Sequence, residues 1–121
     1  MAVVLIVEDD VFILAIAEMM IQDWGHNTLS AGDVDEAMTL LRSGQHIDAL
    51  FTDIYLKSAV LGGCELACQA IKLRSHLRVL YTTGNSITAG MKAMFVDGGH
   101  VLSKPYTEHQ LQDSLEDLLA A

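Results

Sequence analysis

Four short segments of the sequence carry side chains suited to phosphoryl chemistry. They are the acids at 8–10, Asp53, the hydroxyl pair at 82–83 and Lys104. Crowded carboxylates repel one another unless a cation lies between them, and Mg²⁺ takes oxygen ligands of this kind. A lysine can bind a phosphoryl oxygen, and a spare carboxylate can act as a nucleophile and form an aspartyl phosphate. If the fold brings them together, these groups predict Mg²⁺-assisted phosphoryl transfer to a carboxylate.

The elements that must position these groups alternate between short β-rich runs and helical stretches. Strands are predicted at Val3–Val7, Asn27–Ala31, Asp48–Thr52, Arg78–Thr82 and Val101–Ser103. Helices are predicted at Val11–Asp23, from Asp33 to about Ser43, from about Cys64 to Arg74, at Ala89–Val96 and from Thr107 to the chain end. Asp9 or Asp10 is the expected cap of the first helix, and the D-x-x-E and T-x-x-Q patterns at 33–36 and 107–110 predict capping boxes.

This alternation predicts a doubly wound α/β domain with a five-stranded parallel sheet covered on both faces. In such sheets, ligands bind outside the carboxyl ends of the strands. Each of the four chemical segments follows the end of a predicted strand. We therefore expect them to meet at one edge of the sheet.

Length and charge limit the class of protein. The 121 residues fit one domain, 1–121, and leave no room for a DNA-binding or enzymatic output domain. The net charge of -9 disfavours binding to nucleic acid or to an anionic membrane. The apolar run Ala2–Val7 is too short for a signal peptide core or a membrane helix, so we expect a cytoplasmic protein. Cys64 and Cys68 lack the further ligands of a zinc site and are interpreted as helix residues.

The chain resembles the receiver domains of two-component response regulators over its whole length. The resemblance rests on five short matches, V-L-I-V-E-D-D at 4–10, F-T-D-I at 51–54, T-T-G at 82–84, D-G-G at 97–99 and S-K-P-Y at 103–106. Each match is weak alone, but their order and spacing at strand ends are specific. The resemblance implies a flavodoxin-like (βα)5 fold with strand order 2-1-3-4-5.

The same resemblance implies roles for individual residues. Asp53 is the implied phosphoacceptor and Lys104 the contact to its phosphoryl group, with Pro105 fixing the turn behind the lysine. The implied Mg²⁺ ligands are Glu8, Asp9, Asp53 and the backbone carbonyl of Tyr55.

The switch hydroxyl implied on strand four has two candidates. Counting back from Lys104 gives Thr82, but Gly84 directly follows Thr83, and a small residue after the switch hydroxyl favours Thr83. Thr82 and Gly84 are then expected to support the phosphate site.

Three features depart from the family pattern. The loop after Asp53, at 54–63 and including the Gly-rich stretch Lys57–Gly63, is longer than usual and lacks proline. Tyr55 is bulky, and Val101 stands where an aromatic residue is usual. A valine cannot make the large rotation of that aromatic residue, so the switch must be read elsewhere. The helix Val11–Asp23 is apolar almost all round, which predicts either deep burial or an exposed patch for a kinase, a phosphotransfer protein or a homodimer.

The expected function is a stand-alone, phosphorylation-activated signalling switch. It takes a phosphoryl group from a sensor histidine kinase or a histidine phosphotransfer protein, catalyses only its own phosphorylation and dephosphorylation, and then binds an output protein. The alternative is a degenerate receiver that acts as an interaction module without phosphate. Such a module would normally lose an acid, the acceptor or the lysine, and this chain keeps them all.

Overall fold

The computed structural model describes residues 1–56 and 61–120. Its elements alternate along the chain in the order β1 (Val3–Val7), α1 (Val11–Asp23), β2 (Asn27–Ala31), α2 (Val34–Arg42), β3 (Ala49–Asp53), α3 (Gly62–Leu73), β4 (Arg78–Thr83), α4 (Ala89–Lys92), β5 (His100–Ser103) and α5 (Glu108–Ala120). The strands form one parallel sheet in the order β2-β1-β3-β4-β5. The predicted doubly wound fold and strand order are confirmed.

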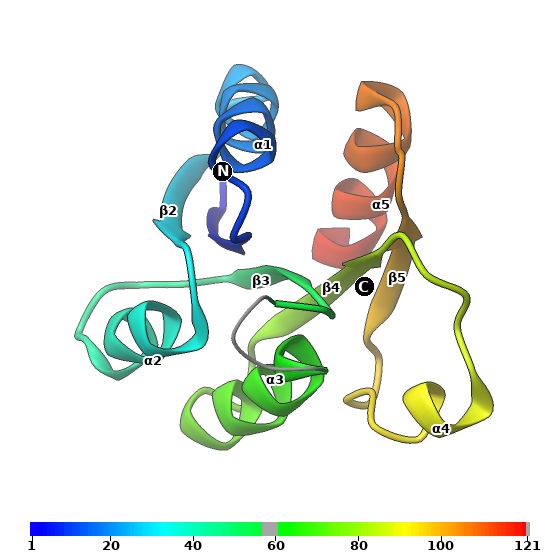
Figure 1. The fold of residues 1–121 in the computed structure, drawn as a ribbon. Coiled ribbons are helices and arrows are strands. Elements are labelled where there is room, and N and C mark those ends of the chain that lie inside the picture. Colours follow the sequence, from blue (N-terminus) through cyan, green and yellow to red (C-terminus); the bar gives the residue numbers. More distant parts are fainter. Residues whose placement is uncertain (57–60, 121) are drawn as a thin grey trace.

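Helices cover both faces of this sheet (Figure 1). On one face α1 and α5 pack on side chains such as Ile6, Phe51 and Leu80. On the other face α2, α3 and α4 pack on alternate strand residues such as Leu5 and Tyr81. Burial of both faces explains the nearly continuous apolar strands in the sequence.

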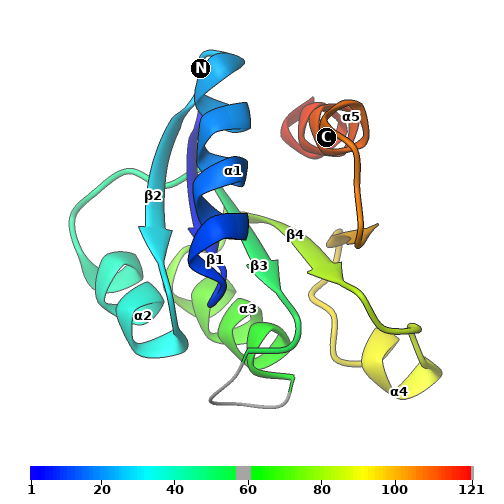
Figure 2. The ribbon, with the colours of Figure 1, turned by 45° about the horizontal axis from the view of Figure 1, so that its top comes forward.

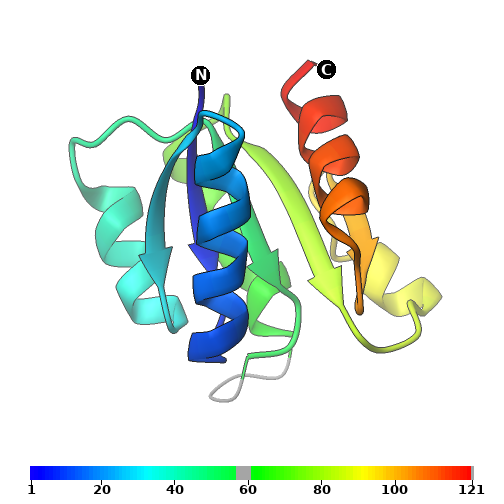
Figure 3. The ribbon, with the colours of Figure 1, turned by 90° about the horizontal axis from the view of Figure 1, so that it is seen from above.

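The strand arrows point the same way, so the carboxyl ends of the strands share one edge of the sheet (Figure 3). Asp10 caps α1 by accepting hydrogen bonds from the backbone N–H groups of Phe12 and Ile13. The predicted capping box at the start of α5 is present in both directions between Thr107 and Gln110. These caps fix where α1 and α5 begin relative to that edge.

The prediction of a helix from Ala89 to Val96 is wrong in its length. α4 ends at Lys92 and lies beyond the end of β4 (Figure 2). The Tyr81 hydroxyl accepts a hydrogen bond from Val96 N at 3.0 Å, and the ring of Phe95 stacks on that of Tyr81 at 4.5 Å. These contacts with a buried strand residue hold the chain away from a helical path, which local sequence patterns do not reveal.

Smaller boundary differences also bear on the site. β3 runs one residue further than predicted, and therefore includes Asp53, and β4 includes Thr83. The predicted loop Lys57–Gly63 falls partly on residues 57–60, which lie outside the described residues, and α3 already begins at Gly62. Within the described ranges, no helix combines the length and apolar character needed to cross a membrane.

An acidic site at the carboxyl edge of the sheet

Asp53 is the last residue of β3, and its side chain lies in a nearly closed site. The residue is 7% exposed. Its Oδ2 accepts a hydrogen bond from Lys104 Nζ at 2.9 Å, and its Oδ1 accepts one from the backbone N–H of Tyr55 at 3.3 Å. The carboxylate is thus held by one charged and one neutral donor at the edge where ligands of such sheets bind.

Lys104 links this carboxylate to a second one. Its ammonium also donates to Glu8 Oε2 at 2.9 Å, and its backbone N–H donates to the carbonyl of Thr83. Burial on its own would favour the neutral amine, but the hydrogen bonds and charges of Glu8 and Asp53 outweigh it, so the pKa of Lys104 lies above its usual value. The lysine therefore stays charged at neutral pH and faces the Asp53 carboxylate.

Glu8 lies directly after β1 and is 5% exposed. Its Oε1 accepts the backbone N–H of Asp10 at 3.1 Å, while Oε2 is bound by Lys104. Burial raises the pKa of Glu8, and the nearby charge of Asp53 adds to this, while Lys104 and the Asp10 N–H partly oppose it. The site therefore penalises a further uncompensated negative charge.

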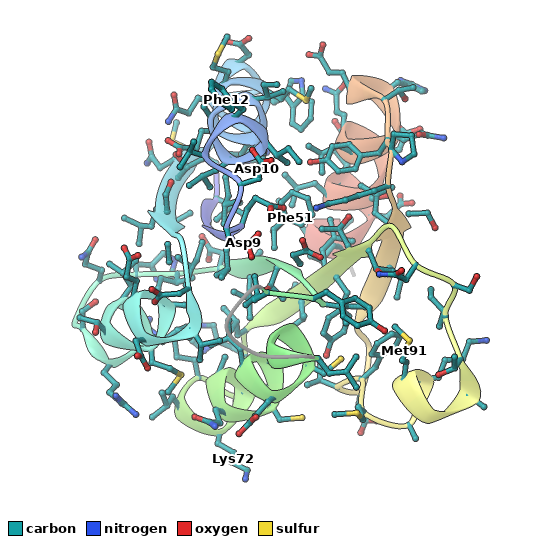
Figure 4. The ribbon with its side chains drawn as sticks, in the orientation of Figure 1. Asp9, Asp10, Phe12, Phe51, Lys72 and Met91 are labelled. Carbon is teal, nitrogen blue, oxygen red and sulfur yellow. The ribbon has the colours of Figure 1, made fainter. Side chains whose placement is uncertain are left out.

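Asp9 completes the acidic group. Asp9 and Asp10 lie in the connection between β1 and α1 (Figure 4). One carboxylate oxygen from each of Glu8, Asp9 and Asp53 lies within 4.8 Å of the others. Three carboxylates against one ammonium leave excess negative charge, and oxygen donors at this spacing suit a hard divalent cation such as Mg²⁺. The donor set thus fits the metal expected from the sequence, while the Tyr55 carbonyl stays a prediction as a ligand.

The two threonines at the end of β4 are both buried. Thr83 Oγ1 accepts the backbone N–H of Asn85 at 3.1 Å. Thr82 Oγ1 has no hydrogen-bond partner among the described residues. The structure places both threonines at the carboxyl end of β4, beside Asp53 at the end of β3, and both remain candidates for a phosphoryl contact.

An apolar groove opens beside the site. It has a volume of about 440 Å³ and is lined by Ile13, Ile16, Met20, Gly84, Lys104, Pro105 and Tyr106. The predicted support residues Gly84 and Pro105 thus lie with Lys104 on the groove wall. The peptide bond between Lys104 and Pro105 is cis.

Gly63 is a site residue that the sequence reasoning missed. A Cβ atom built on Gly63 would lie 2.8 Å from the carbonyl carbon of Asp53 and 2.9 Å from the Cα of Ile54. Only glycine lets the first turn of α3 approach the backbone of Asp53 so closely. The pair Gly62-Gly63 was visible as a signal, but it was interpreted only as part of a loop.

The fold and the site together define a class of protein. An open parallel α/β sheet with acids, a lysine and hydroxyls at the carboxyl ends of its strands is an arrangement for binding a metal and a phosphoryl group. The chain belongs to the response regulator receiver domain family, whose sequence model matches residues 4–116. The resemblance found in the sequence is confirmed, and members of this family are phosphorylation-activated response regulators that interact with histidine kinases and phosphotransfer proteins.

Solved structures agree with this assignment. A response regulator receiver protein from Sinorhizobium medicae WSM419 superposes with a TM-score of 0.89 at 25% identity, covering 99% of this chain and 95% of its own. The chemotaxis protein CheY4 of Vibrio cholerae gives 0.85 at 23% identity, covering 98% and 99%. The receiver domain of the hybrid histidine kinase CckA gives 0.79 at 23%, covering 97% and 98%. The last two similarities concern the fold alone.

Proposed function

We propose that this receiver domain is a phosphorylation switch that accepts a phosphoryl group on Asp53 from a phosphohistidine donor. The observation that carries the proposal is the double contact of Lys104 Nζ, 2.9 Å from both Asp53 Oδ2 and Glu8 Oε2, beside the acid Asp9. A degenerate module would have no need to keep a partly buried lysine charged between two acids.

The reaction forms one bond and breaks one. A carboxylate oxygen of Asp53 attacks phosphorus, the bond from phosphorus to the histidine nitrogen breaks, and that nitrogen keeps the electron pair and takes up a proton. Lys104 pairs with a phosphoryl oxygen as a point charge. A Mg²⁺ ion held by Asp9, Asp53 and the Tyr55 carbonyl, with Glu8 in the same acidic group, would neutralise phosphoryl charge. A hydroxyl of strand β4, Thr83 by the sequence pattern, contacts another phosphoryl oxygen.

The α1 surface supports a helical donor protein as the partner. Its apolar side chains Val11, Phe12, Ile16 and Met19 are exposed, while Ala17 and Ile21 are buried. Phe12, labelled on α1 in Figure 4, is 78% exposed. Ile16 also lines the groove that reaches Lys104. The acids Asp10 and Asp23 lie at the two ends of α1, and the first 41 residues carry no Lys or Arg. A helix with an apolar stripe and basic flanks fits this surface better than a second copy, which would oppose acids with acids.

Mass spectrometry tests the phosphoacceptor. After incubation with a small phosphodonor and Mg²⁺, the parent chain should gain the mass of one phosphoryl group, and Asp53→Asn should gain none. Asp33→Asn is the matched control, because Asp33 caps α2, does not belong to the acidic group of Glu8, Asp9 and Asp53, and asparagine caps equally well. An unlabelled parent would favour the degenerate module, and full labelling of Asp53→Asn would move the acceptor elsewhere.

Replacement of Phe12 tests the docking surface. Phe12→Ser should slow phosphoryl transfer from a phosphorylated histidine phosphotransfer protein about tenfold, because an anchoring aromatic side chain of an interface is lost. Labelling by a small phosphodonor should not change. Leu73→Ser, which removes a half-exposed apolar side chain from α3 on the other face, is the control. Equal transfer rates for the parent and Phe12→Ser would place the donor on another surface. We also propose that residues 1–121 act as one receiver domain in the cytoplasm.

A further inference from the structure

The hydroxyl of Thr82 is an unused hydrogen-bonding group at the centre of the site. Thr82 is 3% exposed, and among the described residues Thr82 Oγ1 is the only buried side-chain oxygen or nitrogen atom without a hydrogen-bond partner. Nearby threonines differ, since Thr83 Oγ1 accepts from Asn85 N and Thr52 Oγ1 donates to the carbonyl of Asp53. Buried polar groups are nearly always paired, so an unpaired one in a reaction site points to a partner that arrives later.

The pairing of β3 with β4 places Thr82 beside the phosphoacceptor. Asp53 and Thr82 are register partners on these neighbouring parallel strands, which lie about 4.8 Å apart in such sheets. Successive strand side chains point to opposite faces. Thr82 therefore shares the face of Leu80, which packs with Phe51 towards α1 and α5, and Asp53 shares the face of Phe51. The two side chains are neighbours on one face of the sheet.

Thr83 points the other way. It alternates with Thr82 and shares the face of Tyr81, which packs in the core formed with α2, α3 and α4. Thr83 is thus placed to move with the α4 side of the molecule, whereas Thr82 lies level with the carboxyl group of Asp53. The two hydroxyls are not interchangeable, and the sequence pattern T-T-G hides this difference.

Phosphorylation changes what the Asp53 carboxyl group can bind. Once the phosphorus–oxygen bond forms and the bond to the histidine nitrogen breaks, the negative charge lies on the phosphoryl oxygens. Lys104, now on Asp53 Oδ2, is drawn towards that charge. With Lys104 withdrawn towards the phosphoryl group, the acyl carbonyl oxygen remains an acceptor, and the buried hydroxyl of Thr82 on the same face can donate to it.

Resting on the proposed function, we infer that Thr82 donates its hydroxyl proton to the acyl oxygen of phosphorylated Asp53. Thr82 is then a second hydroxyl of the site, in addition to the switch hydroxyl Thr83. Its hydrogen bond forms only in the phosphorylated state, so it stabilises that state relative to the free one. In the free protein the unpaired hydroxyl is a cost to stability.

Titration with beryllofluoride, a phosphoryl mimic that binds the acceptor carboxylate, tests this role. We expect Thr82→Val to bind it roughly threefold to tenfold more weakly than the parent, the effect of one neutral hydrogen bond. The free Thr82→Val protein should melt at the same temperature as the parent or higher, because an unpaired buried hydroxyl has been removed. If Thr82 had only a structural role, its replacement by valine would not weaken beryllofluoride binding while leaving the melting temperature of the free protein undiminished.

A second pair of variants keeps the test independent of the valine. Thr82→Ser and Thr82→Ala differ by the hydroxyl oxygen alone, and the serine variant should bind beryllofluoride more tightly by the same factor. Thr39→Val is the control, because the Thr39 hydroxyl donates to the carbonyl of Asp35 within α2 and not to a group of the site. It should bind as the parent does.

The outcomes separate this inference from the proposed function. A parent protein that fails to bind beryllofluoride would contradict phosphorylation at Asp53 itself. If the parent binds beryllofluoride but Thr82→Val binds it with the same affinity, the role of Thr82 alone is overturned. Equal affinities of Thr82→Ser and Thr82→Ala would overturn it in the same way.

Discussion

The hydroxyl of Tyr55 lies 3.7 Å from Sδ of Met91, a buried residue of α4. The backbone N–H of the same tyrosine donates to Asp53 Oδ1. One residue thus touches Asp53 with its backbone and α4 with its side chain. Val101 takes the place where the family usually has an aromatic residue, so Tyr55 offers a physical connection between the site and α4 that does not need that aromatic.

We predict that phosphorylation is read through the segment from Gly84 to Phe95. Beryllofluoride should cause its largest remote NMR shift changes at residues 84–95, because the hydroxyl of β4 and Tyr55 both adjoin that segment. Tyr55→Phe removes only the contact to sulfur and should reduce those changes. Val101→Ala should barely alter them, since valine is too stiff and short to transmit a swing. Loss of the changes in Val101→Ala, or shifts that avoid this segment, would refute the pathway.

Gly63→Ala should disturb the site from the backbone side. The added methyl group would meet backbone atoms of Asp53 and Ile54, which cannot move aside without shifting β3 or α3. We expect the free energy of unfolding to fall by about 1–3 kcal/mol, as for other overpacked positions, together with slower phosphorylation by a small phosphodonor. Urea denaturation and the labelling rate measure the two effects. Gly44→Ala is the control, because a Cβ atom there meets no atom within 4 Å. Equal behaviour of the two variants would show that the close approach is unimportant.

Mg²⁺ affinity should depend on Asp9. Asp9→Ala removes one of three clustered carboxylates, and we expect binding to weaken about tenfold or more, equivalent to at least about 1.4 kcal/mol. NMR shifts of residues around Asp53 during a Mg²⁺ titration give the affinity. Asp23→Ala removes the same charge from the far end of α1 and should bind normally. If Asp23→Ala weakens binding as much as Asp9→Ala, the effect is one of overall charge.

Asp48 should stabilise the fold above acidic pH. Burial on its own raises the pKa of Asp48, but hydrogen bonds from Val3 N at 2.8 Å and from His46 outweigh it, and the pKa lies below its usual 3.8. A lowered carboxyl pKa gives stability that is fully present above the unfolded-state pKa and is lost as the pH falls through the folded-state pKa. Asp48→Ala should therefore lower the free energy of unfolding by about 1–2 kcal/mol at pH 7, and the difference from the parent should narrow below about pH 4. Urea denaturation over this pH range is the measurement, and a difference that does not change with pH would contradict the role of the charge.

The sequence by itself determined the order and type of the elements. Apolar strand runs and helix caps such as Asp10, Asp33 and Thr107 are local signals. The predicted bounds of β1, α1 and β2 are those found in the structure. Because parallel strands end at one edge of the sheet, the positions of Asp9, Asp53 and Lys104 after strand ends were enough to predict their meeting.

Only the tertiary structure decided the relationships that depend on pairing across the sheet. The length of α4 is set by the contact of Val96 with Tyr81, fifteen residues earlier in the chain. The need for glycine at 63 comes from the approach of α3 to β3. The distinction between Thr82 and Thr83 follows from the register of β4 against β3, since a shift of one residue exchanges the two faces. Such facts arise between segments distant in sequence, where no local pattern records them.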